Sequence, residues 1–112
     1  MKLVLVLLAP LALLLTAAPA QAAGPVCLPE AQVCAGLEDG QFVFTIKPPP
    51  TTLTVSATVN DVPVTGSLTH QSAPSYVQGW YEPYPALVSG DVICLTLNAP
   101  GVSPGPYCDT QP

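Results

Sequence analysis

Positive charge is almost missing from this 112-residue chain, which holds two Lys and Arg residues against seven Asp and Glu and has a formal net charge of −5 at pH 7. One of the two, Lys2, lies at the extreme N-terminus, and Lys47 is the other. Electrostatic binding to nucleic acid needs clustered Lys and Arg side chains that neutralise phosphates. The composition therefore predicts an acidic protein that does not bind nucleic acid.

Metal ligands are also scarce. The sequence has one histidine, His70, and its four cysteines lack the short C-x2-C spacing that is typical of zinc sites. The acidic turn Glu38–Gly40 lacks the alternating oxygen ligands of a calcium loop. We expect no metal and no cofactor.

Groups for nucleophilic catalysis are equally few. A hydrolase would need His70 as a general base beside Ser67 or Ser72, and a buried carboxylate to orient the imidazole. No acidic residue lies near His70 in the sequence, although Asp61 or Asp91 could approach it in space. We interpret His70 as a solvated residue at the end of a strand and predict that the protein is not an enzyme.

Only the N-terminus carries a long apolar run, and prolines interrupt it. The order of Lys2, an apolar stretch and small residues is typical of a secretory signal peptide. A membrane-spanning helix needs about 20 uninterrupted apolar residues, whereas Pro10 and Pro19 break this run. We predict that residues 1–22 are a signal peptide and that the mature chain is secreted or periplasmic, without membrane contact.

Cysteine is present in an even number, and in a small exported domain this predicts a disulfide framework. Cys94 and Cys108 lie on either side of Gly101, so a chain reversal there would bring them face to face. The remaining pair is then Cys27 with Cys34. That pairing requires that no continuous helix joins them, because seven helical residues would separate their Cα atoms by about 10 Å.

Proline is abundant, with 15 residues spread along the chain. Each proline in a helix interior costs about 3 kcal/mol, so we predict no helix beyond a short turn near Glu30. Period-two alternation of apolar and polar residues predicts strands instead, with a hairpin turn at Asn60–Asp61. The expected strands are residues 41–47, 52–59, 62–70, 76–81 and 91–98, with a last short one at 107–108.

These strands and turns predict an all-β fold, a small antiparallel sandwich or partly open barrel cross-linked by disulfides. The pattern TLTVSATVNDVPVTG…W…LVSGDVICLTL, within Gln41–Leu97, resembles the immunoglobulin-like β-sandwich modules of exported bacterial proteins. In the antibody type of that fold, Trp80 would lie between a bridged Cys34 and Cys94, so this crossed pairing stays open beside the local pairs. The resemblance implies a fold and not an activity.

The expected domain organisation follows from these boundaries. After the signal peptide, residues 23–40 form a disulfide-containing lead-in, and residues 41–112 form the β-sandwich domain. So short a domain buries only about 60–65% of its unfolded surface, so its core is marginal without cross-links.

Aromatic residues are few, and most of them gather in SYVQGWYEPYP, residues 75–85. A strand that turns into polyproline geometry at its end would place Tyr81 and Tyr84 along one exposed edge, with Tyr76 behind them. We expect Trp80 in the core, because so small a domain has few other bulky side chains. The three tyrosines are then the predicted contact surface for a partner protein or a carbohydrate.

The sequence thus predicts a small secreted, non-enzymatic binding module. The alternative is a secreted protease inhibitor that presents the proline-rich, disulfide-closed segment 98–108 as a rigid loop. Stiffening such a loop would lower the ordering cost of binding.

Overall fold

The computed structural model describes residues 27–112, and the predicted signal peptide lies outside the described residues. Within that range the chain forms seven antiparallel strands and no helix. The strands are β1 (Val33–Glu38), β2 (Gln41–Ile46), β3 (Thr54–Val59), β4 (Val62–Ser72), β5 (Val77–Tyr84), β6 (Val92–Asn98) and β7 (Tyr107–Thr110). No helix that could cross a membrane is found in this part of the chain.

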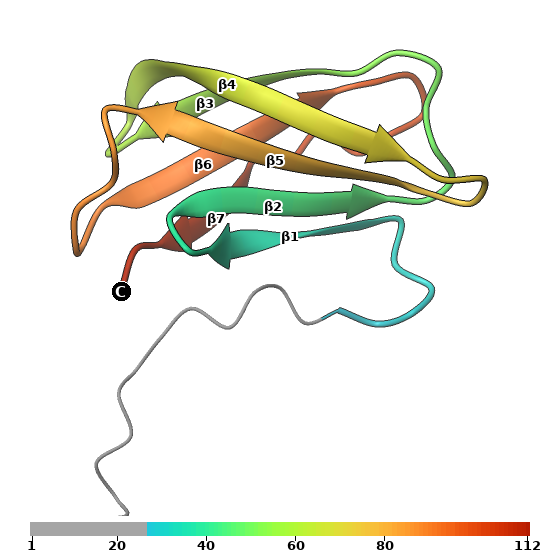
Figure 1. Ribbon diagram of the computed structural model, residues 1–112, viewed down its shortest axis with the longest axis horizontal. Helices are drawn as coiled ribbons and strands as arrows, with labels where there is room; N and C mark the ends of the chain where they lie inside the picture. The colour runs from blue at the N-terminus through green and yellow to red at the C-terminus, as the bar shows by residue number, and fades with distance from the viewer. Residues whose placement is uncertain (1–26) are drawn as a thin grey trace, which may run out of the picture.

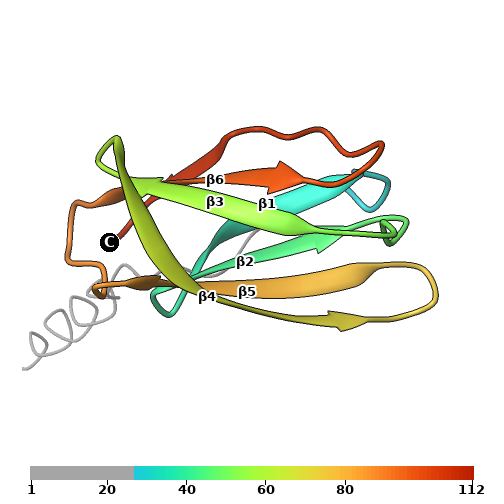
Figure 2. The ribbon, with the colours of Figure 1, turned by 90° about the horizontal axis from the view of Figure 1, so that it is seen from above.

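All seven strands belong to one sheet that bends around the core, in the order β1-β2-β5-β4-β3-β6-β7. One layer holds β1, β2, β5 and β4, and the other holds β3, β6 and β7 (Figure 1 and Figure 2). The layers are joined by β4, which pairs with β3 over residues 62–64 and with β5 over residues 65–72. The predicted all-β, antiparallel sandwich or partly open barrel is confirmed.

The two ends of the sheet meet where β1 lies against β7. There the backbone N–H of Leu37 donates a hydrogen bond of 2.9 Å to Oδ2 of Asp109. This seam between β1 and β7 nearly closes the sheet into a barrel.

The core lies between the layers and is built from alternate residues of each strand. Its fully buried side chains on the two central strands are Phe42, Phe44 and Ile46 of β2 and Ile93, Leu95 and Leu97 of β6. Burying one side chain of this size contributes about 1.5–3 kcal/mol. The period-two alternation that predicted these two strands therefore also identified their inner faces.

One strand, β1, was not expected from the sequence. It lies inside the segment interpreted as a lead-in, pairs with β2 along its whole length and buries Leu37. Two of its three outward positions hold Cys34 and Gly36, and only the last, Glu38, is clearly polar, so the sequence shows no clear alternation there. The sheet consequently begins at Val33.

Both local disulfides are formed, with Cα–Cα distances of 5.8 Å for Cys27–Cys34 and 4.0 Å for Cys94–Cys108. Cys94 and Cys108 face each other on β6 and β7. The crossed pairing is wrong, because Cys34 and Cys94 occupy outward positions on opposite layers, with the core between them. Two disulfides are consistent with an oxidising location, either extracellular or periplasmic.

The predicted hairpin turn at Asn60–Asp61 is confirmed, since both residues adopt left-handed φ values of 51° and 66°. The Asn60 side chain fixes the neighbouring turn by donating to Asp91 Oδ1 over 3.0 Å and accepting from the Val92 N–H over 3.0 Å. The pKa of Asp91 is lowered, mainly because its carboxylate accepts a hydrogen bond from the Val88 N–H and further because it accepts one from the Asn60 amide.

Candidate functional site

The aromatic stretch lies almost entirely on β5, and this strand is longer than expected. Its pairing with β4 runs on to Tyr84, which stands opposite Thr65. Side chains therefore alternate between the two faces through the whole segment, instead of turning every third residue as in polyproline geometry. Tyr81 and Tyr84, three positions apart, consequently point to opposite faces.

Tyr81 belongs to the core and corrects the prediction of an exposed tyrosine pair. Its side chain is 4% exposed. Its ring lies over Gly66, where an added Cβ would stand 2.6 Å from the Tyr81 Cζ and 2.7 Å from its hydroxyl oxygen. Burial raises the pKa of the Tyr81 hydroxyl. Tyr81 therefore does not form an exposed pair with Tyr84.

Trp80 was expected in the core, and this prediction is also wrong. It points outward from β5 and is half-buried, between its cross-strand neighbours Val43 on β2 and Thr69 on β4. The inner positions of β5 are taken by Val77, Gly79, Tyr81 and Pro83. The pairing register, rather than side-chain size, decides which aromatic residue is buried.

Trp80 and Tyr84 thus share the outer side of β5, and Tyr84 is 75% exposed. Together with polar neighbours they form a surface that we call the outer aromatic face. It consists of Trp80, Glu82 and Tyr84 on β5 and Thr65 and Ser67 on β4.

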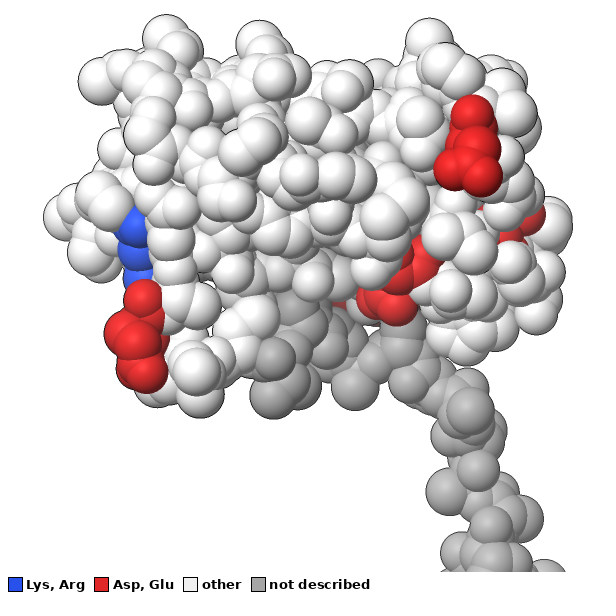
Figure 3. Space-filling view, turned by 180° about the vertical axis from the view of Figure 1, so that it is seen from behind, with Lys and Arg blue, Asp and Glu red and all other residues white. Residues whose placement is uncertain are grey.

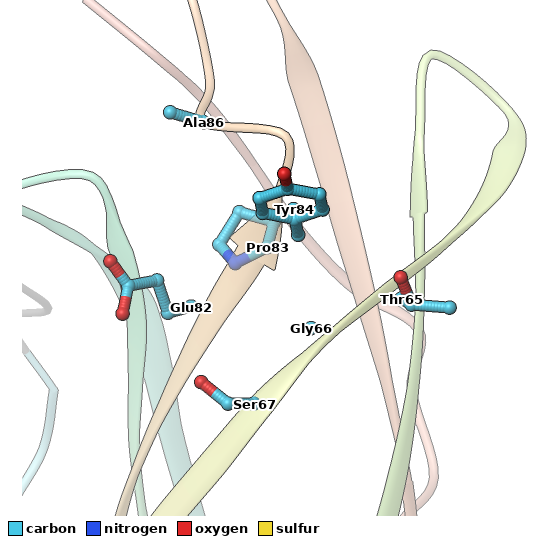
Figure 4. A pocket seen from close by; sticks show the side chains of 7 residues that line it. All are labelled: Thr65, Gly66, Ser67, Glu82, Pro83, Tyr84 and Ala86. Atoms are coloured by element: carbon cyan, nitrogen blue, oxygen red, sulfur yellow. The ribbon is translucent and has the colours of Figure 1, made fainter.

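A shallow hollow of about 520 Å³ opens on this face. Its lining residues are Thr65, Gly66, Ser67, Glu82, Pro83, Tyr84 and Ala86 (Figure 4). Figure 4 shows the Ser67 hydroxyl on the side of Glu82, and Tyr84 follows Pro83 at the end of β5. The hollow therefore combines an aromatic surface, two hydroxyl groups and one carboxylate, and its volume is in the range of small-ligand pockets.

Tyr76, the third predicted contact residue, lies at the other end of β5. It is 38% exposed and precedes the first residue of the strand. Eight positions of extended chain separate it from Tyr84, which corresponds to about 26 Å. The structure therefore does not bring the three predicted tyrosines together.

His70 lies on β4 opposite Gly79 and is exposed. Ser67 projects from the opposite face of the strand, while Ser72 shares the face of His70. Asp61, in the turn before β4, is about 30 Å away along the extended strand. Over residues 27–112 no three His, Cys, Asp or Glu side chains form a group that could hold a metal ion.

The disulfide-closed loop of residues 98–108 is held by hydrogen bonds. The Gln32 side chain donates to the Gly101 carbonyl over 2.8 Å and accepts from the Ser103 N–H over 3.3 Å. The Tyr107 hydroxyl donates to the Ser103 carbonyl over 2.7 Å. These bonds hold the loop in one conformation, as the inhibitor hypothesis requires, and that hypothesis stays a prediction.

The charge of the described surface is almost entirely negative. Lys47 is the one basic residue within residues 27–112, and its Nζ donates to the Pro29 carbonyl over 2.6 Å. Figure 3 shows the molecule from behind, with acidic side chains in separate small patches and a broad uncharged area over the upper and central part of this face. Of the charged side chains, only that of Glu82 lines the hollow on the outer aromatic face.

Comparison of the chain with protein-family models, with curated proteins and with solved structures found no match. The candidate site is therefore inferred from the geometry of the described residues. Trp80 and Glu82 were missed as site residues. Continuing the period-two alternation of residues 76–81 through Pro83 would have placed both with Tyr84.

Proposed function

We propose that this protein is an exported, non-enzymatic binding module that holds a neutral carbohydrate on the outer aromatic face. The observation that carries the proposal is the outward display of Trp80 and Tyr84 from one strand, beside the hydroxyls of Thr65 and Ser67. A small domain with few aromatic residues gains stability by burying them in its core. Aromatic side chains that are exposed instead indicate a binding surface.

The chemistry of the surrounding face favours a carbohydrate over a protein. Outward positions on β4 hold Thr65, Ser67, Thr69 and Gln71, all of them uncharged hydrogen-bonding residues. A sugar ring offers hydroxyl groups to such side chains and an apolar face to an aromatic ring. Protein interfaces are also enriched in Tyr and Trp, but equally in Arg, which this face lacks, and they are depleted in Ser and Glu, which it contains.

The strand order supports the immunoglobulin-like character of the module. With the strands lettered A to G in chain order, the two layers read A-B-E-D and C-F-G. This is the arrangement of a constant-type immunoglobulin sandwich. The fold alone implies no activity, so the functional proposal depends on the outer aromatic face.

Tyr84→Ala tests the proposal. The chain has a single tryptophan, so its fluorescence reports directly on the outer aromatic face. We expect soluble neutral polysaccharides such as β-glucan, xylan or galactomannan to change this fluorescence, and Tyr84→Ala to weaken binding by about tenfold or more, as removing a buried aromatic contact does. Tyr76→Ala, an exposed tyrosine at the far end of β5, is the matched control and should bind as wild type does.

Two results would contradict the proposal. One is binding that is unaffected by Tyr84→Ala. The other is failure to bind any neutral glycan, combined with capture of a protein from a culture extract that Tyr84→Ala abolishes, which would assign the same face to a protein partner.

A further inference from the structure

Most of β4 has a partner strand on one side only. Its pairing with β3 ends at Val64, which stands opposite Ala57, and residues 65–72 pair with β5 alone. All of these residues are exposed except Leu68, which is half-buried. In Figure 2, β4 crosses away from β3 and runs along the margin of its layer.

The hydrogen bonds of the β4–β5 connection show which backbone groups face the open side. The Ala73 N–H donates to the Tyr76 carbonyl over 2.8 Å, so these two residues form a hydrogen-bonded pair. Hydrogen-bonded and non-hydrogen-bonded pairs alternate along an antiparallel ladder. The odd-numbered residues of β4 therefore bond to β5, and Gly66, Leu68, His70 and Ser72 direct their N–H and C=O groups to the open side.

The position of Pro83 agrees with this assignment of the hydrogen-bonded pairs. Pro83 stands opposite Gly66, and proline has no N–H to contribute to a hydrogen-bonded pair. A non-hydrogen-bonded position is where a proline is tolerated within this ladder.

The open edge lacks the features that normally block edge-to-edge pairing. Residues 65–72 contain no Lys, Glu or Pro and keep a continuous register without a bulge. The other two edges of the sheet, β1 and β7, lie against each other and are joined by the Leu37–Asp109 hydrogen bond. Within the described chain, residues 65–72 of β4 thus form a long strand edge that nothing protects from pairing with another strand.

An apolar groove of about 430 Å³ accompanies this edge. It opens where β3 and β4 diverge, and its apolar lining residues are Leu53, Val55, Val64, Leu68 and Tyr81. A strand added to β4 would therefore gain main-chain hydrogen bonds and also bury side chains in this groove.

We propose that β4 pairs antiparallel with β4 of a second copy of this chain, which gives a two-fold symmetric dimer. Such an interface is self-complementary, and Leu68 of each copy would cover the groove of the other. The charge distribution selects this occupant: an acidic protein repels its own copies elsewhere, but residues 65–72 carry no acidic group, so no carboxylates meet across the new pair.

His70→Pro tests the pairing, and sedimentation equilibrium over a wide concentration range is the measurement. We expect wild type to approach twice the monomer mass as its concentration rises. His70→Pro removes an N–H from the open side and leaves pairing with β5 intact, so it should stay monomeric. His70→Ala is the matched control, because it keeps the N–H, and it should dimerise as wild type does. Circular dichroism checks that each variant is folded.

Amide hydrogen exchange by NMR tests the same proposal on the unmodified protein. As the concentration rises, the amides of Leu68 and His70 should exchange more slowly, while those of Thr69 and Gln71, already bonded to β5, should not change. A monomer at every concentration, a dimer that survives in folded His70→Pro, or assemblies that grow beyond two copies would overturn the proposal.

Discussion

At the scale of single residues, two glycines inside strands make room for two of the three aromatic rings in the core. Gly66 lies under the Tyr81 ring, and Gly79 lies under the Phe44 ring. Glycine weakens a strand interior and is retained where another group approaches closely. Both glycines lie on the inner faces of their strands, where the absence of a side chain leaves space for these rings.

Gly79→Ala should destabilise the fold through this contact. A Cβ at Gly79 would overlap the Phe44 ring, with its Cε1 atom 2.6 Å away. Both residues sit in the core between paired strands, so we expect a loss of about 1–3 kcal/mol, the usual cost of overpacking. Urea unfolding monitored by tryptophan fluorescence measures it. Gln78→Ala, the outward neighbour, is the control and should change stability by less than about 0.5 kcal/mol; equal losses in both variants would refute the packing argument.

At the scale of strands and turns, the sequence predicted what local patterns encode. The β2, β3 and β6 segments alternate apolar and polar residues, and Asn60–Asp61 favours left-handed turn geometry, so these elements were predicted within a few residues. The prediction from the sequence missed β1 and ended β5 too early. Pairing with β2 holds β1, whose sequence shows no alternation, whereas the end of β5 pairs with Thr65 and continues an alternation that the prediction ended at Tyr81.

The Cys94–Cys108 disulfide should stabilise the protein more than Cys27–Cys34 does. It joins β6 to β7, a strand of four residues with one strand partner. Replacing both cysteines by alanine removes a cross-link that closes a loop of about 15 residues, worth roughly 3 kcal/mol, and also frees β7 to detach. Replacing Cys27 and Cys34 loosens only the segment that precedes β1.

Thermal unfolding of the two double variants measures this difference. The melting temperature should fall further without Cys94–Cys108. An equal or larger fall without Cys27–Cys34 would show that the N-terminal turn, and not β7, limits stability.

At the scale of the whole molecule, the sheet order is what the sequence could not supply. The seam joins Leu37 to Asp109, residues that are 72 positions apart. It also depends on β1, which the sequence did not predict. The candidate site shows the same dependence, because Thr65 and Ser67 reach Tyr84 only after β4 leaves β3 and pairs with β5.

Asp109 should be the residue on which this closure depends. Its carboxylate accepts the Leu37 N–H in a partly buried position, and an unsatisfied backbone donor there costs about 1–3 kcal/mol. Asp109→Ala should therefore lower the free energy of unfolding by roughly that amount and speed exchange of the Leu37 amide, while amides in the β3–β4 hairpin stay as protected as in wild type. Asp109→Asn keeps an acceptor oxygen and should lose less. If Asp109→Ala leaves the Leu37 amide protected, the two ends of the sheet are held together by packing alone, and the hydrogen bond across the seam contributes nothing to closure.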